Sequence, residues 1–213
     1  MVYLKTKRII DIFLSLIGLI VLSPVLWILI IAIKIDSTGP VLFKQKRIGK
    51  GKTQFDILKF RTMRIDTPKD MPTHLLENPE QYITKMGNFL RKTSLDELPQ
   101  IWNIFIGQMS IIGPRPALWN QYDLIAERDK YGANDVVPGL TGWAQINGRD
   151  ELRIEVKAKL DGEYVQRMSF GLDVKCFFGT IINVLKSDGV VEGGTGEMHK
   201  EEAEKEKQEV VNE

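Results

Sequence analysis

The chain contains little cysteine and little histidine. One of its 213 residues is cysteine, Cys176, and two are histidine, His74 and His199. A single cysteine excludes an internal disulfide, which is typical of a reducing, cytoplasm-facing environment. Two histidines argue against a histidine-ligated metal site. Any metal is therefore expected to be a hard cation held by carboxylates and phosphates.

A strong net charge is also missing, since 29 Lys and Arg balance 28 Asp and Glu. We accordingly expect no nucleic-acid partner. The charges are unevenly spread: the first hundred residues are rich in Lys and Arg, and the tail is rich in Glu. With 43% hydrophobic residues, the length suits one domain with an appendage. Residues 193–213 have few apolar residues, which predicts a disordered or solvated acidic tail.

One long apolar run stands near the N-terminus, from Ile9 to Ile35. About 20 apolar residues suffice for a helix to cross a bilayer, so this run is expected to enter the membrane. It is too long for a secretory signal peptide and lacks a small-residue cleavage site. Asp11 and Lys34 lie near its ends, where a charge costs little.

The pair Ser23-Pro24 interrupts this run near its middle. Proline frees a carbonyl and disfavours helical geometry at the preceding residue, and the Ser23 hydroxyl is a local partner for freed backbone. Lys and Arg flank both ends, which favours keeping both on the cytoplasmic side. Residues 1–38 are therefore predicted to form a re-entrant helix–break–helix, with a proline-kinked single span as the alternative.

Residues 39–192 are predicted to form a cytoplasm-facing catalytic domain of α+β class, mostly helical. Two short strands joined by a Gly-Lys-Gly-Lys turn are expected, at Val41–Arg47 and Gln54–Arg61. Lys59 and Arg61 would share one face and could meet a phosphate together, the alternative being an ordinary solvated strand face. A polar loop is expected from Arg64 to Pro79. Helices are expected at 80–90, 117–131, 152–164 and 172–185. The last has a broad apolar face, which either packs on the core or lies in the bilayer interface.

The stretch from Arg91 to Pro116 carries two adjacent carboxylates, Asp96 and Glu97. Ser94 stands three residues before Glu97, the spacing of a capping box, and apolar residues follow at helical spacing. The pair would then lie in a first helical turn, where anions are favoured. Carboxylates there are also common without any function. The basic approach, the Pro-locked arginine and the membrane-seeking segment favour a functional interpretation.

Two later elements suit phosphate. In Gly113-Pro-Arg-Pro116 the flanking prolines hold Arg115 in an extended backbone, which suits bidentate phosphate capture. Such a tripeptide is also a common plain turn. The stretch Pro138–Arg149 is a glycine-rich loop ending in a basic residue. It either brings backbone close to a phosphate or simply turns the chain.

Four motifs occur in order behind the interrupted apolar segment: K-F-R-T-M at 59–63, S-L-D-E-L at 94–98, G-P-R-P at 113–116 and P-G-L-T-G-W-A-Q at 138–145. Together they resemble the bacterial sugar transferase family, the monotopic phosphoglycosyl transferases of the PglC type. The resemblance covers the chain up to about Gly194, and the short length resembles the minimal catalytic members.

The resemblance implies transfer of a sugar 1-phosphate from a UDP-sugar to undecaprenyl phosphate, with release of UMP, at the cytoplasmic face of the bacterial inner membrane. It implies an N-acetylated hexose and amphipathic interfacial helices around the active site. It makes Asp96 the nucleophile that forms a covalent phosphosugar, with Glu97 as its partner and Mg²⁺ at this pair. The reaction begins capsule, exopolysaccharide or glycoprotein glycan synthesis.

The same resemblance places further residues. Lys59 and Arg91 match basic active-site positions, and Arg115, between Pro114 and Pro116, matches an element associated with the nucleotide. Phosphate binding falls on Arg149, and a further acidic position falls on Asp161. One departure is Val137, where family members often carry Lys or Arg, so a substrate contact from that side chain is absent.

Two other functions stay open. A glycosyltransferase that moves only the sugar would release UDP, and a non-catalytic, membrane-anchored scaffold of a polysaccharide assembly complex would tolerate loss of the Asp96 carboxylate. The sequence alone decides neither the sugar nor the oligomeric state, and a homo-oligomer is compatible with it.

Overall fold

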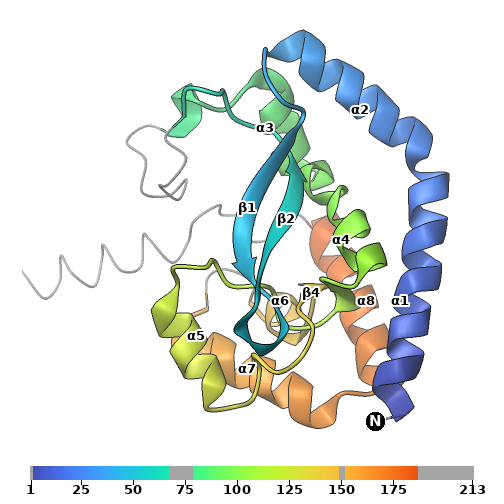
Figure 1. The fold of residues 1–213 in the computed structure, drawn as a ribbon, viewed down its shortest axis with the longest axis vertical. Helices are drawn as coiled ribbons and strands as arrows, with labels where there is room; N and C mark the ends of the chain where they lie inside the picture. Colours follow the sequence, from blue (N-terminus) through green and yellow to red (C-terminus); the bar gives the residue numbers. More distant parts are fainter. Residues whose placement is uncertain (1, 68–78, 149–151, 187–213) are drawn as a thin grey trace, which may run out of the picture.

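The computed structural model describes residues 2–67, 79–148 and 152–186. Within them the fold is mostly helical with two small sheets, as the predicted α+β class requires. Figure 1 shows the hairpin β1–β2 running down the centre, with α1 and α2 forming one long side of the molecule. The predicted acidic tail and most of the predicted polar loop at 64–79 lie outside the described residues.

The apolar N-terminal run forms two helices, α1 (Val2–Val21) and α2 (Ser23–Asp36), with a bend of 60° between them. No single described helix is long and apolar enough to cross a membrane, and this bent pair meets the requirement only when its two helices are taken together, by length and composition. Pro24 has no N–H to offer the carbonyl of Ile20, and the Ser23 hydroxyl donates to that carbonyl at 2.8 Å. The predicted break, with Ser23 as the local partner, is confirmed.

The polar residues at the start of α1 make tertiary contacts. The Arg8 guanidinium donates to the carbonyls of Ile104 and Phe105 at 2.6 and 2.7 Å. Asp11 is buried, and its carboxylate accepts a hydrogen bond from the Ile111 N–H at 3.0 Å. These residues therefore dock α1 onto the rest of the fold, a role beyond the charge bias and small end-of-helix cost considered from the sequence.

The predicted hairpin is confirmed to within a residue as β1 (Leu42–Ile48) and β2 (Gln54–Phe60), joined through the 3-10 turn η1 (Lys50–Lys52). The strands are antiparallel, with Gln45 opposite Ile57. The Ile57 side chain of β2 is buried in a cluster with Ile104 and Met109. A second sheet is parallel and pairs β3 (Ser110–Ile112) with β4 (Gly139–Thr141).

The remaining described helices include those predicted at 80–90, 117–131, 152–164 and 172–185, with shifted bounds, and a short helix, α6, within the stretch predicted as a glycine-rich loop. They are η3 (Pro79–Gln81), α3 (Lys85–Lys92), η4 (Leu95–Glu97), α4 (Gln100–Ile106), α5 (Tyr122–Asp129), α6 (Trp143–Ile146), α7 (Ile154–Arg167) and α8 (Phe170–Lys186). The helix predicted at 80–90 starts later, because the Thr84 side chain accepts a hydrogen bond from the Gly87 N–H and caps α3. The helix predicted at 117–131 is shorter, since the chain before it pairs with β1.

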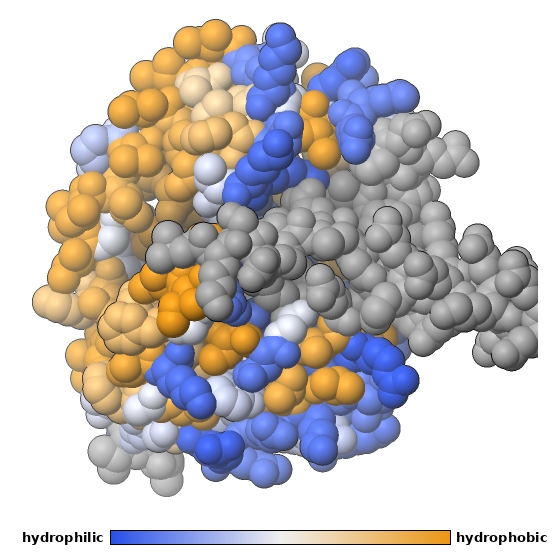
Figure 2. Space-filling model, turned by 180° about the vertical axis from the view of Figure 1, so that it is seen from behind, coloured by the Kyte–Doolittle hydropathy of each residue, from blue (hydrophilic) through white to orange (hydrophobic). Residues whose placement is uncertain are grey.

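Apolar side chains are exposed along one side of the molecule. Figure 2 shows them gathered on the side that α1 and α2 form, while the lower face is largely hydrophilic. Many of the exposed ones lie on α1, α2, α4 and α8, and these include Phe13, Trp27, Ile35, Trp102 and Phe178. The apolar face of α8 is therefore largely exposed rather than packed on the core, although Cys176 beneath it is fully buried.

Candidate active site

The acidic pair lies in the 3-10 turn η4, not in the first turn of an α-helix. Ser94 adopts the left-handed region (φ 55°, ψ 17°), its side chain caps nothing, and its N–H donates to the Arg91 carbonyl at 3.1 Å. Ser94 occupies the N-cap position of η4 but makes no side-chain hydrogen bond to it, so the predicted capping box is wrong, whereas the acidic pair does lie in the first turn of a helix, the 3-10 turn η4. Helix α4 begins after Pro99, where the missing N–H of proline costs nothing.

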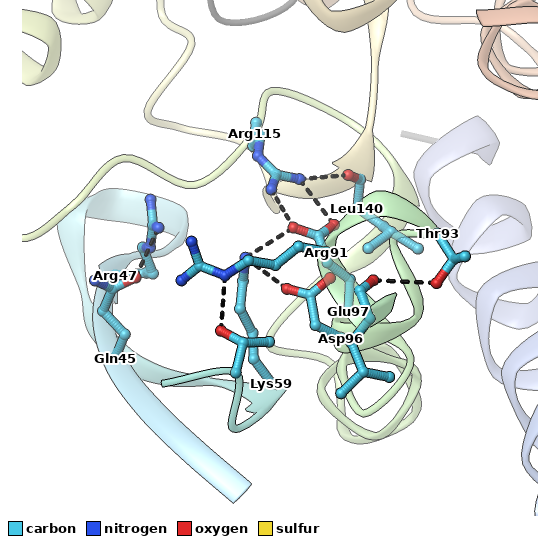
Figure 3. Close-up of polar contacts among 11 residues, drawn as sticks. Gln45, Arg47, Lys59, Arg91, Thr93, Asp96, Glu97, Arg115 and Leu140 are labelled. Carbon is cyan, nitrogen blue, oxygen red and sulfur yellow. Dashed lines mark hydrogen bonds and ion pairs between the residues drawn. The ribbon is translucent and has the colours of Figure 1, made fainter. Parts of the chain in front are cut away.

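Glu97 is held by two cations from distant segments. Lys59 Nζ of β2 lies 2.9 Å from Glu97 Oε1, and Arg115 Nη1 lies 3.3 Å from Oε2, while Arg115 Nη2 also bonds Oε1. Figure 3 shows Arg115 reaching down to Glu97 from the opposite side to Lys59. Burial by itself would raise the pKa of Glu97, but the charges and hydrogen bonds of Arg115 and Lys59 hold it well below its ordinary value of 4.5. Glu97 is therefore ionised at neutral pH.

Asp96 lies beside the same lysine. Its side chain is 12% exposed, and its Oδ2 lies 3.7 Å from Lys59 Nζ, so one ammonium serves both carboxylates. Arg91 is drawn in the same cluster, with its Nε donating to the Thr62 hydroxyl at 2.8 Å. The predicted quartet of two carboxylates, Lys59 and Arg91 is thus brought together, and Arg115 joins it from the proline-bounded turn.

Asn103 of α4 holds β2, the strand that carries Lys59, in place relative to the acidic pair. Its amide accepts from the Leu58 N–H at 3.0 Å and donates to the Asp56 carbonyl at 2.9 Å. The residue is 1% exposed, so these hydrogen bonds form where water does not compete. Asn103 therefore fixes β2 to the helix that follows the acidic pair. The sequence analysis missed it, although a lone amide inside an apolar helical run was the available signal.

The glycine-rich loop packs against the Pro-Arg-Pro turn by its backbone. The Gly139 N–H donates to the Pro114 carbonyl at 2.9 Å, and the Gly113 N–H donates to the Thr141 carbonyl at 2.8 Å. A Cβ added to Gly139 would lie 2.1 Å from the Gly113 nitrogen, so no side chain fits there. The Leu140 carbonyl accepts from Arg115 at 3.2 Å. This close backbone packing accounts for the glycines without a ligand.

Two predicted residues, Arg61 and Asp161, lie away from the cluster, and the position of a third is not described. Arg61 does not share the phosphate-facing side with Lys59: it is buried and donates to the carbonyls of Ser37 and Thr38, because β2 ends at Phe60. Arg149 lies outside the described residues. Asp161 is considered below.

Asp161 lies in the interior between α5 and α7. Its Oδ2 accepts from Arg128 Nε at 2.8 Å and from Nη2 at 2.5 Å, and both side chains are almost completely buried. These contacts make Asp161 one half of a buried ion pair, and they give no support to the predicted substrate-binding role.

The donor set fits a hard cation that is also bound by phosphate. Mg²⁺ commonly takes one or two protein carboxylates, with substrate phosphates and water completing its shell. Asp96 and Glu97 supply two adjacent carboxylates, and the described residues contain no group of three or more His, Cys, Asp or Glu able to hold a metal. Both Glu97 oxygens and Asp96 Oδ2 already lie beside cations of the protein, so a bound metal ion would share these carboxylates with them.

Comparison with known proteins agrees with this geometry. Residues 2–187 match the family described as bacterial sugar transferase. The chain is 42% identical over 183 residues to UDP-glucose:undecaprenyl-phosphate glucose-1-phosphate transferase of Escherichia coli, covering 82% of this chain and 39% of that protein. It is 39% identical to the uncharacterised sugar transferase EpsL of Bacillus subtilis, covering 86% and 89%.

A third relative is UDP-N-acetylgalactosamine-undecaprenyl-phosphate N-acetylgalactosaminephosphotransferase of Aeromonas hydrophila, 35% identical over 88% of this chain and 45% of that protein. The described cluster places two carboxylates, Asp96 and Glu97, among the cations Lys59, Arg91 and Arg115 (Figure 3). The chain belongs to the bacterial sugar transferase family. It spans less than half the length of the E. coli and A. hydrophila proteins and most of the length of EpsL.

Proposed function

We propose that this protein transfers a sugar 1-phosphate from a UDP-sugar to undecaprenyl phosphate and releases UMP. The observation that carries the proposal is the meeting of Asp96 and Glu97 with Lys59 and Arg115 in one half-buried cluster. Relatives over this same length are named for reactions of this type. We propose an N-acetylated hexose as the sugar, and glucose is the alternative that other relatives' names raise.

Asp96 is the proposed nucleophile. Its carboxylate oxygen forms a bond to the phosphorus that carries the sugar, and the bond from that phosphorus to the oxygen bridging it to UMP breaks, with UMP as leaving group. An oxygen of undecaprenyl phosphate then attacks the same phosphorus, which frees Asp96 and forms undecaprenyl diphosphate sugar. Lys59 and Arg115 are placed to stabilise the charge on the phosphoryl oxygens.

Because the ammonium and guanidinium are already beside the carboxylates, they need to turn only from Glu97 towards the incoming diphosphate. Asp96 and Glu97 would hold Mg²⁺, which when bound screens the carboxylates from the substrate's negative charge. Arg91 from α3 lies in the same cluster (Figure 3). This arrangement stabilises an anionic phosphoryl group without any histidine.

We further propose that the protein is monotopic, on the cytoplasmic side of the bacterial inner membrane. The bent pair α1–α2 enters the bilayer and returns, and the exposed apolar residues of α4 and α8 rest in the interface. Figure 2 supports this with one continuous apolar side. The site then lies near the lipid surface, where undecaprenyl phosphate presents its headgroup. Capsule, exopolysaccharide or glycoprotein glycan synthesis is the proposed context.

The test is UMP release by the purified protein with undecaprenyl phosphate, Mg²⁺ and a panel of UDP-sugars. Asp96→Asn should lose about 10³-fold or more of the activity, because removal of a nucleophile leaves little beyond binding. Asp129→Asn, at a surface ion pair, is the matched control and should retain activity. Without lipid acceptor, sugar phosphate should stay covalently on the wild-type protein and be absent from the Asp96 variant.

Each alternative gives a different result. A glycosyltransferase would yield UDP instead of UMP. A non-catalytic scaffold would show no turnover with any UDP-sugar, and Asp96→Asn would leave its cellular role intact. Full turnover in Asp96→Asn would overturn the covalent mechanism.

A further inference from the structure

We infer that Arg47 of β1 is a positioning residue that holds the Pro-Arg-Pro turn and thereby aims Arg115 at the reacting phosphates. The inference rests on the proposed function, in which Arg115 binds the diphosphate. Arg47 is outside the set of residues expected from the sequence, and its guanidinium contacts neither Asp96 nor Glu97 in any hydrogen bond described above.

The turn needs donors from outside itself. Pro114 and Pro116 have no N–H, so backbone carbonyls are what neighbouring segments can hold. The Gly139 N–H donates to the Pro114 carbonyl at 2.9 Å, and the Ile48 N–H donates to the Ala117 carbonyl at 2.9 Å. The Pro116 carbonyl, one residue from Arg115, accepts from Arg47 Nη1 at 3.0 Å. That contact comes from a side chain, unlike the other two.

Arg47 is itself fixed on two sides. Its Nη2 donates to Gln45 Oε1 at 2.7 Å, and Figure 3 shows these two side chains joined beside the cluster. Its backbone forms an antiparallel bridge with Leu118, so the strand and the turn also meet through the main chain. Nη1 and Nη2 of one planar group thus hold two acceptors at fixed angles. A lysine, with one ammonium on a flexible stem, cannot reproduce this fork.

Loss of the fork should move Arg115. The turn would keep its two backbone contacts at residues 114 and 117, so the fold should persist, but the peptide between them would lose its restraint. Arg115 must meet both Glu97 and the Leu140 carbonyl, 3.2 Å from its Nη1. A misplacement of about 1 Å can cost on the order of a hundredfold in rate.

The first test is a double-mutant cycle on kcat/KM for UDP-sugar. Arg47→Met should lower it about 10- to 100-fold in the wild-type background, but less than about twofold when Arg115 is already Met, because the residue acts through Arg115. Arg47→Lys should lose most of the same activity despite keeping the charge. Equal losses in both backgrounds, or full rescue by lysine, would overturn the inference.

Lys46→Met is the matched control. It removes one positive charge from the neighbouring, exposed position of β1, opposite Asp56, and should change kcat/KM by less than about twofold. Gln45→Ala should give a smaller loss than Arg47→Met, because it releases one arm of the guanidinium. If Lys46→Met lowers activity as much as Arg47→Met, general electrostatics explain the effect and positioning is wrong.

A second readout needs no turnover. Phenylglyoxal modifies arginine, and its rate at Arg115 can be followed by mass spectrometry of the peptide in the absence of substrate. In the Arg47→Met variant, phenylglyoxal should modify Arg115 several-fold faster than in the wild type or in Lys46→Met, because the Arg115 guanidinium is released from its partners. An unchanged rate would overturn the inference. If the wild type released no UMP, the proposed function would fail while this measurement still decided the role of Arg47.

Discussion

The sequence and the structure indicate different roles for Asp161, substrate binding and a buried ion pair, and a substitution distinguishes the two. In the structure it forms two hydrogen bonds with Arg128, at 2.8 and 2.5 Å, and the side chains are 1% and 4% exposed. Asp161→Asn keeps the shape of the side chain but removes its charge. The buried guanidinium is then left without its counter-ion, which typically costs about 3–5 kcal/mol.

The magnitude is large enough to measure by thermal unfolding. For a protein of this size each kcal/mol lowers Tm by about 2–4 °C, so the variant should unfold roughly 6–20 °C earlier. Circular dichroism at 222 nm in detergent follows the loss of helix. At a temperature where the variant is still folded, KM for the UDP-sugar should stay within about twofold of wild type, because Asp161 does not reach the cluster around Glu97.

Two further variants sharpen the result. Asp135→Asn makes the same chemical change at an exposed site and should leave Tm unchanged within error. The double variant Arg128→Met with Asp161→Leu replaces the pair by apolar groups and should recover most of the stability. If Asp161→Asn kept its Tm and raised KM instead, the ion-pair interpretation would be wrong and a substrate-binding role would stand.

Three other predictions follow from the structure. Because folding lowers the pKa of Glu97, its ion pairs stabilise the folded protein fully above the ordinary pKa of 4.5, and this stabilisation is lost as the pH falls below that value. The difference in unfolding free energy between wild type and Glu97→Gln should therefore shrink from pH 7 to pH 3. A difference that stays constant over this range would contradict the prediction. Burial raises the pKa of Cys176 to about 11, so a disulfide reagent at pH 8 should label it only after unfolding, and fast labelling of the folded protein would refute this. Pro24→Ala restores an N–H for the Ile20 carbonyl and removes a penalty of about 3 kcal/mol against a straight helix. The accessibility of a reporter placed after residue 36 should therefore shift towards the other side of the membrane. Unchanged accessibility of the reporter would show that the bend does not depend on the proline.

The local features that could be predicted from the sequence are those that depend on neighbouring residues. The hairpin was placed to within a residue, because alternation and a glycine turn specify a strand pair locally. The break at Ser23-Pro24 follows from the missing proline N–H, whatever surrounds it. The family resemblance then named Asp96, Glu97, Lys59 and Arg115 as a set.

Local reasoning failed where a residue serves a distant partner. Ser94 has the spacing of a capping box, yet at the N-cap position of η4 it adopts a left-handed conformation and its side chain makes no capping hydrogen bond. Arg61 lies two residues after Lys59, the spacing of one strand face, but it donates to the carbonyls of Ser37 and Thr38 after α2, since the strand has already ended at Phe60. Neither outcome is visible in the residues next to them.

The sequence alone therefore determined the long apolar segment, its interruption and the order of the motifs, because each depends on covalent geometry and local hydropathy. The tertiary structure alone decided which charges meet: that Glu97 is held by Lys59 and Arg115, that Asn103 ties β2 to α4, and that Arg47 supports the proline turn. Charges interact through space over a few ångströms, and the sequence separations of 38 and 18 residues that Lys59 and Arg115 span to Glu97 carry no local signal of that distance.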